Sequence, residues 1–388
     1  FELHGAEEDM LPLCCLKSKN RGRYIVPSEN PVPHGVENVA PAPDENINPE
    51  QISPTKDTVT MAKKIDSELE ASKLQSGKTI PVLLLGTQNA GKSTIMKQLK
   101  LIHGSAPDER QRKLLIPLIH SQIVTYLQKL ILDSSIEVGE AEEKVLDLNP
   151  SSSIDQMKGS MIEKIWKQHQ RSWMDETLYS SLDYFISKLD CILQQQYIPD
   201  NTDFVYLRIP TVGVHTCRIC VLDIHFEVYD VGGQRSERRK WVHFFDNAKA
   251  IIYLTALDEF DRLTTENGQP MNCLMNSINV FSEISHQQCL SHIPLVIFFN
   301  KIDLFTKKIR KKNIKSVPEF SSFRGESENA NAAVRYFKYL FMKENPFPHR
   351  AVYCHVTCGL ETESIKHVFS LCVDNIVRQK LSMNGLPV

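Results

Sequence analysis

The sequence of 388 residues lacks a strong charge imbalance, a long apolar run and a dense pattern of cysteines. Its 45 Lys and Arg residues stand against 47 Asp and Glu residues, which argues against nucleic acid as the main partner. No apolar run approaches the roughly 18 residues that cross a bilayer, and the start lacks the pattern of a secretory signal. The ten cysteines are scattered, so we expect a cytosolic protein with reduced thiols.

Two local features have ordinary explanations. Cys217 and Cys220 have the spacing of a metal site, but they lie in the strand-like run HTCRICVLDI, where residues three apart point to opposite faces. We therefore expect no metal site there. The basic run from Lys307 to Lys315 reads as a solvated loop or helix face rather than a binding patch.

The chain opens with a segment that is rich in proline and poor in periodic hydrophobicity, so we predict a disordered tail over residues 1–56. A helix is predicted over 57–78, because Met61, Ile65 and Leu69 recur at four-residue steps. Cys14 and Cys15 are candidates for palmitoylation, and ordinary thiols are an equal alternative. Because the sequence opens with Phe, no myristoylation signal can be read.

Short apolar runs, most of them separated by helix-length stretches, predict an α/β fold with parallel strands. The first run, IPVLLLG, ends at Gly86. Further strands are predicted at 217–222, 225–230, 250–257, 295–300 and 352–357. Between about Pro107 and Pro199 the strand signals vanish and apolar residues recur at helical steps, which indicates an all-helical insert.

The strongest motif follows the first predicted strand and fits GxxxxGK[ST]: Gly86, Thr87, Gln88, Asn89, Ala90, Gly91, Lys92, Ser93. Its glycines let backbone N–H groups surround phosphates, and the start of the following helix adds a favourable dipole. Lys92 can neutralise phosphate oxygens and Ser93 can bind Mg²⁺. This motif alone predicts only a nucleotide site.

Three further elements follow predicted strands. In the first, Asp230 can hold Mg²⁺, the glycine pair that ends at Gly233 would lie by the γ-phosphate, and Gln234 can orient a water molecule. In the second, Asn300, Lys301 and Asp303 form a segment whose carboxylate can accept two hydrogen bonds from guanine, which adenine cannot supply. The third, whose backbone N–H groups could contact the guanine oxygen, is the loop Thr357, Cys358, Gly359.

Four such elements in this order predict a guanine-nucleotide site at the carboxyl edge of the sheet. With these residues in place, the chain from about Asp57 onward resembles the α subunit of heterotrimeric G proteins. The stretches that carry the resemblance are GKSTIMKQLKLIH, DFVYLRIPTVG, DVGGQRSERRKW, FFNKIDLF and HVTC. The resemblance implies a Ras-like P-loop GTPase domain, with a mostly parallel six-stranded sheet, over 79–104 and 203–388, and an inserted all-helical domain over 105–202.

By this resemblance, Arg208 would be the arginine that steadies the transition state in cis, a role that the general template for phosphoryl transfer assigns to this family. Thr211 would complete a Mg²⁺ shell with Ser93, and Thr94 and Leu207 would join the nucleotide contacts. The segment after Gln234 would be a helix that reorders between the GDP and GTP states. Trp241 would report that movement.

The resemblance also implies partners and a location. A βγ dimer would bind the 57–76 helix and the reordering segment, and a seven-helix membrane receptor would bind residues 363–388. Effector proteins and GTPase-activating regulators would be further partners. The expected location is peripheral, at the cytoplasmic face of the plasma membrane.

Two positions in the phosphate loop and one later segment depart from the family. The usual loop GAGESGKS reads GTQNAGKS here, so Gln88 replaces a glycine and Asn89 replaces an acid. We hypothesise that Gln88 crowds the γ-phosphate and slows hydrolysis, and that Asn89 speeds GDP release. Around 258–275 the acidic switch segment is replaced, with Cys273 and Asn276 at the coupling positions.

The main alternative is a scaffold that binds nucleotide with little turnover. Arg208, Thr211 and Gln234 argue for the enzyme, because a scaffold has no evident need for all three. An ATP-using enzyme is disfavoured by Asn300, Lys301 and Asp303.

Overall fold

The computed structural model describes residues 79–104, 106–133, 138–169, 176–209, 211, 213–221, 223–266 and 268–383. The expected tail over 1–56, with its two cysteines, and the expected helix over 57–78 lie outside these residues.

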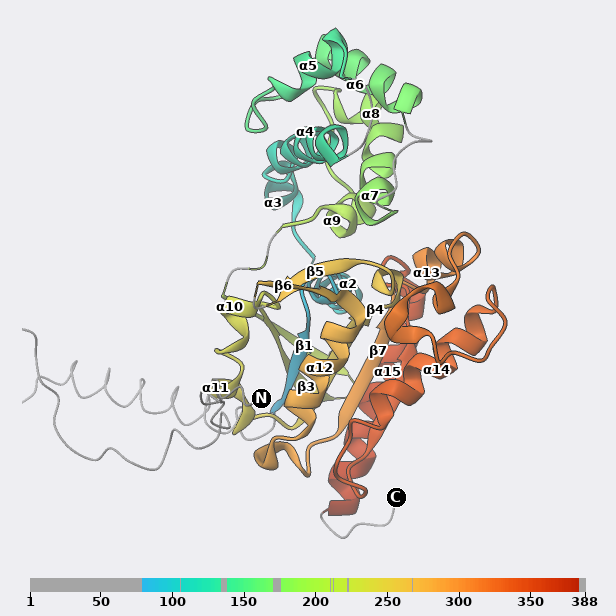
Figure 1. The fold of residues 1–388 in the computed structure, drawn as a ribbon. Coiled ribbons are helices and arrows are strands. Elements are labelled where there is room, and N and C mark those ends of the chain that lie inside the picture. Colours follow the sequence, from blue (N-terminus) through green and yellow to red (C-terminus); the bar gives the residue numbers. More distant parts are fainter. Residues whose placement is uncertain are drawn as a thin grey trace, which may run out of the picture. The chain divides into compact units, whose positions relative to one another are not determined.

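A six-stranded sheet organises the part of the chain that carries the motifs (Figure 1). Its order is β2-β3-β1-β4-β7-β8. The strands β1 and β4, β4 and β7, and β7 and β8 pair in parallel, whereas β2 and β3 pair antiparallel. The strand bounds are Thr79–Gly86 for β1, Val214–Val221 for β2, Ile224–Val231 for β3, Ala250–Ala256 for β4, Leu295–Asn300 for β7 and Val352–Val356 for β8. The predicted fold class, a mostly parallel six-stranded sheet with added helices, is confirmed.

The centre of the sheet is apolar because helices cover both of its faces. Every residue of β4 and β7 is buried. The register places Leu83 of β1 opposite Ile251 of β4, and Ile251 opposite Leu295 of β7. Continuous apolar runs such as AIIYLTA therefore form central strands, in which a polar side chain would lose its water on either face.

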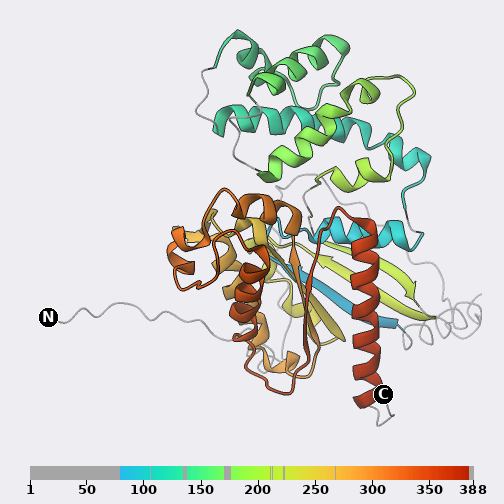
Figure 2. The same ribbon diagram turned by 90° about the vertical axis from the view of Figure 1, so that its right-hand side faces the viewer.

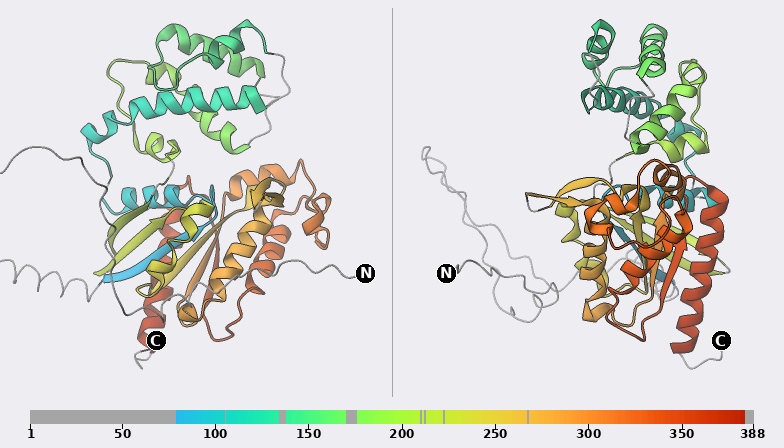
Figure 3. Two further views of the ribbon diagram at one scale, coloured as in Figure 1. Left: turned by 60° about the vertical axis from the view of Figure 1, so that its left-hand side comes forward. Right: turned by 45° about the vertical axis from the view of Figure 1, so that its right-hand side comes forward.

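Successive side chains of β1 supply two different cores, as the pleat of a strand requires. Val82 and Leu84 pack with α2 (Lys92–Ile102) and α15 (Thr362–Met383), the long helix along one face in Figure 2. Leu83 and Leu85 pack on the opposite face of the sheet. Figure 3 shows helices on both sides of the sheet. The helices that contribute to this second core are α11 Val242–Phe245, α12 Cys273–Ser285, α13 Ile302–Ile309 and α14 Ala330–Met342, together with the short helices η2 Leu257–Glu259, η3 Gln288–Leu290, η4 Ile314–Ser316 and η5 Pro318–Phe320.

Between α2 and β2 all regular elements of the described residues are helices. They are α3 Glu109–Lys113, α4 Ile116–Asp133, α5 Glu140–Leu146, α6 Gln156–His169, α7 Glu176–Ser187, α8 Leu189–Ile192 and α9 Asn201–Tyr206. They share a core of their own around α4, to which Ile119, Ile123 and Leu127 contribute fully buried side chains.

One helix of this region differs from the expectation that no apolar segment is long enough to cross a bilayer. The helical stretch 109–133 is long and apolar enough by length and composition, and 44% of its most apolar window is buried inside the protein. A core helix of a folded domain passes this test as well, so the finding is weak evidence for a membrane span.

One local expectation differs from the structure, and one local element was not predicted. The segment after Gln234 is not one helix but two short ones, α10 (Arg235–Arg238) and α11, and the buried Trp241 lies between them. A two-stranded hairpin, β5 (Leu263–Glu266) with β6 (Gln269–Asn272), follows the short helix η2 (Leu257–Glu259). The dipeptide Asn-Gly at 267–268 is a strong hairpin signal and could have predicted it.

Candidate functional site

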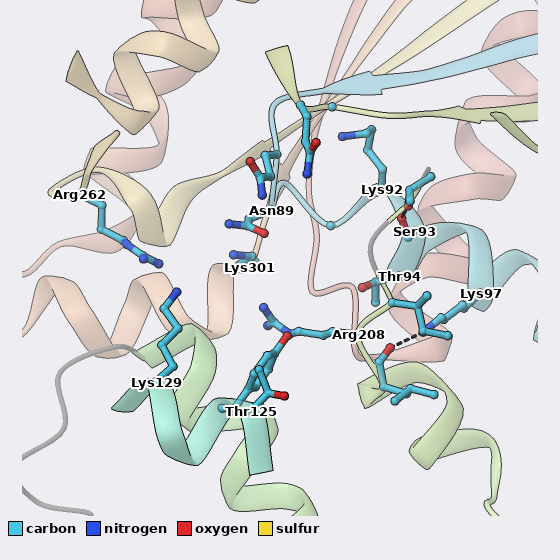
Figure 4. A pocket seen from close by; sticks show the side chains of 18 residues that line it. Asn89, Lys92, Ser93, Thr94, Lys97, Thr125, Lys129, Arg208, Arg262 and Lys301 are labelled. Atoms are coloured by element: carbon cyan, nitrogen blue, oxygen red, sulfur yellow. Dashed lines mark hydrogen bonds between the residues drawn. The ribbon is translucent and has the colours of Figure 1, made fainter. Parts of the chain in front are cut away.

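A cavity of about 390 Å³ lies where the loops after β1, β3 and β7 meet, a size typical of small-molecule sites. Figure 4 shows its side chains. The predicted site residues that line it are Gln88, Asn89, Gly91, Lys92, Ser93, Thr94, Leu207, Arg208, Thr211, Gly233, Gln234 and Lys301. The structure therefore brings together residues that lie more than 200 positions apart in the chain.

The loop between β1 and α2 needs its glycines for space as well as for conformation. At Gly86 the φ angle is +145°, and a Cβ would lie 2.3 Å from the carbonyl oxygen of Leu254. At Gly91 the φ angle is +101°, and a Cβ would meet the side-chain amide of Asn300. Asn89 has φ +61°, which asparagine tolerates better than most residues. Gln88 is exposed and has no positive φ, so its backbone does not require glycine.

Lys92 is buried at the start of α2, and its ammonium group donates to the carbonyl oxygens of Gly86 and Thr87, both at 2.9 Å. Burial lowers the pKa of Lys92 to about 8, against an opposing contribution from the carboxylate of Asp230. A cation held in this way at a ring of backbone N–H groups favours a bound anion.

Three oxygen-bearing side chains converge beside Lys92. Ser93 Oγ donates to Asp230 Oδ2 at 2.9 Å and forms a short hydrogen bond with Thr211 Oγ1. The other carboxylate oxygen, Asp230 Oδ1, is buried and has no hydrogen-bond partner in the described structure. Burial raises the pKa of Asp230. Hard oxygen ligands with one free carboxylate oxygen fit Mg²⁺, which accepts few protein ligands and keeps others from water or phosphate.

Asn300 links two of the predicted elements directly. Its Nδ2 donates to Ala90 O at 2.9 Å, and its Oδ1 accepts from Gly359 N at 3.0 Å and from Thr357 Oγ1 at 3.1 Å. The side chain therefore ties the phosphate-type loop to the loop after β8. These contacts give Asn300 a bracing position between the two loops, and its expected place among the nucleotide-binding residues stays a prediction.

Of the remaining base-side residues, Asp303 and the loop 357–359 lie outside the lining of the cavity. Lys301 lies in the cavity lining, and its ammonium group pairs with the buried carboxylate of Asp258 at 3.3 Å. Asp303 lies in the first turn of α13 and is half-buried. Burial, followed by the charge of Asp303, raises the pKa of Cys358 to about 12, so this thiol stays neutral beside the carboxylate.

The two predicted catalytic residues enter the cavity from different segments. Arg208 follows α9, and its backbone N–H donates to Gln122 Oε1 at 2.5 Å. Gln234 is exposed at the start of α10. The neighbouring Gly233 packs so closely on the loop after β1 that a Cβ would lie 2.6 Å from Gly86 O. Trp241 donates through Nε1 to Gly232 O at 3.0 Å, so its indole is coupled to the same glycine pair.

Sequence reasoning missed several residues that line the cavity, among them Lys97, Thr125, Lys129 and Arg262. Lys97 lies one turn after Ser93 on the same face of α2, and this spacing could have indicated it. No sequence signal shows which face of α4 meets the cavity. In Figure 4 the charged ends of Lys129, Arg208 and Arg262 point into the same space.

The charge of the lining is one-sided. Six cations line the cavity, and none of its 18 residues in the described structure is an Asp or Glu. The cations are Lys92, Lys97, Lys129, Arg208, Arg262 and Lys301. A cleft lined by positive charge attracts polyanions such as a nucleotide triphosphate.

A parallel sheet with a glycine-rich loop and lysine after its first strand, a carboxylate after β3 and an Asn-Lys-x-Asp segment after β7 defines a P-loop GTPase. The comparisons agree. The family model described as the G-protein alpha subunit matches residues 60–376. The "Guanine nucleotide-binding protein alpha-1 subunit" of Caenorhabditis elegans is 32% identical over 86% of this chain and 98% of its own length. The "Guanine nucleotide-binding protein alpha-17 subunit" of the same organism is 30% identical over 84% of this chain and 95% of its own.

This chain belongs to the family of G protein α subunits. It is accordingly a GTP-binding signalling switch with GTPase activity, as the sequence predicted. Members of this family act in general with a βγ dimer, receptors and effectors.

Proposed function

We propose that the cavity holds GTP with its phosphates against the loop 86–93, and that this chain hydrolyses it with its own Arg208 and Gln234. The one-sided charge of the cavity carries this proposal, because six cations without a carboxylate suit a triphosphate and little else of that size. The backbone N–H groups of the loop and the N-terminus of α2 would face the β-phosphate. Thr94 and Leu207 would add further contacts.

In the proposed reaction, Gln234 orients a water molecule for in-line attack on the γ-phosphorus. A bond forms between the water oxygen and phosphorus while the bond to the β–γ bridging oxygen breaks, and GDP and phosphate result. Arg208 would donate to the oxygens on which negative charge develops, and Lys92 would leave its two carbonyl partners to do the same.

We propose Ser93, Thr211 and Asp230 as the residues that hold Mg²⁺. The unpartnered Asp230 Oδ1 and the convergence of the two hydroxyl groups support this assignment. When bound, the ion would supply positive charge at the phosphates. The short hydrogen bond between Ser93 and Thr211 joins the two segments that carry these hydroxyl groups.

For the base, we propose that Asp303 accepts hydrogen bonds from guanine, with Lys301 beside it and the loop 357–359 around the guanine oxygen. Asn300 would fix the position of this pocket relative to the phosphate loop through its hydrogen bonds to Ala90 and Gly359. A single braced unit of this kind explains how base recognition and phosphate binding share one geometry.

The departures from the family loop lead to two kinetic proposals. Gln88 places an exposed side chain in the cavity lining, where it would crowd Gln234 and slow hydrolysis. Asn89 brings no charge to a cavity whose cations have no acidic partner in the lining, so GDP would be held without the carboxylate that closes the cleft in the family. GDP release would be faster as a result.

We further propose a division into a GTPase domain over 79–104 and 203–388 and an inserted helical domain over 105–202. A βγ dimer would contact the segment of α10 and α11 together with the helix expected over 57–78. A seven-helix receptor would meet α15, and the protein would lie peripherally at the cytoplasmic face of the plasma membrane. The general partners of the family support these assignments.

One experiment tests the core of the proposal: GTP binding and single-turnover hydrolysis by the full chain, Arg208→Ala and Gln234→Leu, with and without Mg²⁺. We expect all three proteins to bind GTP more tightly than ATP, and both variants to hydrolyse it at least a hundredfold more slowly. Binding without turnover in all three proteins would instead indicate a nucleotide-binding scaffold. Equal affinity for GTP and ATP would refute the base assignment.

A further inference from the structure

The backbone that leads into Arg208 is held by side chains from outside its own segment. α9 has only six residues, and the last four carbonyl groups of any helix have no partner within the helix. Lys97 on α2 donates from Nζ to Phe204 O at 2.9 Å and to Leu207 O through a short hydrogen bond. Its ammonium group also lies 5.1 Å from the centre of the Phe204 ring. A cation thus caps the negative end of the helix.

The opposite side of the same backbone is held from α4 and α7. Gln122 accepts from Arg208 N at 2.5 Å and donates from Nε2 to Tyr206 O at 3.4 Å and to Ser181 Oγ at 2.6 Å. Ser181 Oγ donates in turn to Tyr206 O at 3.2 Å. Gln122 and Ser181 are both buried, so water does not compete for these bonds.

These contacts fix the direction in which the chain leaves α9. The carbonyl groups of Phe204, Tyr206 and Leu207 and the N–H group of Arg208 are bound by side chains from two sides. Arg208 is the first charged residue after α9 that lines the cavity. We propose that Lys97 and Gln122 are positioning residues that aim Arg208 at the phosphates. This inference rests on the proposed role of Arg208 in hydrolysis.

A purely structural cap would not need a cation at this place. Burial, followed by the charge of Arg208, lowers the pKa of Lys97 to about 8, so Lys97 is held at an electrostatic cost. A neutral donor could satisfy the same carbonyl groups without that cost. A cation at this place is explained if Lys97 holds the backbone and its charge, by repulsion, directs the guanidinium group of Arg208 toward the cavity.

The test is a double-mutant cycle on the full chain with Lys97→Met and Arg208→Ala, read by single-turnover GTP hydrolysis. Lys97→Met keeps the apolar stem and removes the donors. We expect it to slow hydrolysis by one to two orders of magnitude, because a displacement of about 1 Å at a catalytic group can cost a hundredfold. Lys97→Arg, which keeps a cationic donor, should recover most of the rate.

Matched controls separate positioning from general damage. Lys100→Met makes the same change on the same helix at a residue that lines a different pocket, and should hydrolyse GTP like the unaltered protein. Because Lys97 is one of the six cations that line the cavity, Lys97→Met should weaken GDP binding. The affinity for GDP with aluminium fluoride, which mimics the transferring phosphoryl group, should fall at least tenfold further. Gln122→Met tests the inference independently from the helical side, whether or not Lys97→Met folds.

The outcomes divide cleanly. If Lys97→Met and Arg208→Ala are each slow and the double variant is no slower than Arg208→Ala, Lys97 acts through Arg208 and the inference holds. If Arg208→Ala is slow but Lys97→Met and Gln122→Met hydrolyse at the normal rate, or their effects multiply with that of Arg208→Ala, the inference is wrong while the role of Arg208 stands. If Arg208→Ala is fast, the proposed role of Arg208 fails and the inference with it.

Discussion

Replacing Gly233 by alanine gives the sharpest single test of how the glycine pair and the phosphate loop fit together. An added Cβ would lie 2.2 Å from Lys92 Nζ, 2.6 Å from Gly86 O and 2.8 Å from Thr87 O. The lysine end can move, but the two carbonyl groups belong to the loop backbone and cannot. The segment of Gly233 must therefore retreat by roughly 0.8 Å before the methyl group reaches an ordinary contact distance.

Gln234 is the next residue and must move with Gly233. Because a displacement of about 1 Å at a catalytic group can cost a hundredfold, we expect Gly233→Ala to slow single-turnover hydrolysis by about 30- to 100-fold, or roughly 2–3 kcal/mol in activation free energy. Binding of GDP, which lacks the γ-phosphate proposed to lie by Gly233, should change by less than about threefold.

The assay is rapid mixing of preloaded GTP with Mg²⁺ and detection of released phosphate. Gly268→Ala is the matched control, since Gly268 also lies in a turn but an added Cβ there meets nothing within 4 Å. Because Gly268 has φ +76°, this control carries its own backbone strain of order 1 kcal/mol, which affects stability and not turnover. A Gly233→Ala rate within threefold of the unaltered protein would show that the glycine pair tolerates a side chain, and the reasoning would fail.

The other predictions concern the loop, the tryptophan and a buried histidine. Gln88→Gly should raise the single-turnover rate, and an unchanged rate would discard the crowding argument. Asn89→Glu should slow the release of a fluorescent GDP analogue; equal exchange rates would contradict that proposal. Binding of a slowly hydrolysed GTP analogue should change tryptophan emission, and Trp241→Phe should abolish the change, because Trp241 bonds to Gly232 O. If the signal survives, another tryptophan carries it. His120 accepts from Ile154 N at 3.0 Å, and burial lowers its pKa below 6.5. The unfolded chain thus takes up the proton first as pH falls, so stability present at neutral pH should be lost below about pH 6.5. In chemical denaturation at about pH 7.5 and 5.5, His120→Asn, which keeps an acceptor, should lose less stability than the unaltered protein; equal losses would exclude this histidine.

Much of the fold and of the site could be read from local sequence. Wholly apolar runs must be buried on both faces, so AIIYLTA and LVIFFN predict central strands almost to the residue. The loop from Gly86 to Ser93 needs specific residue types at fixed spacing for backbone reasons, and Gly86 and Gly91 do have positive φ angles. Where the chemistry of a motif is built into a few adjacent residues, the sequence by itself determines it.

Only the tertiary structure decided which residues far apart in the chain contact each other. The sequence places Asn300 in the base-recognition segment, and only the structure shows that its amide links Ala90 to Gly359. The roles of Lys97 and Gln122 depend on the place where a six-residue helix ends in space, which no local pattern encodes. Periodicity predicts an amphipathic helix but does not name the partner of its polar face. That partner is set by loop lengths and packing summed over the whole chain.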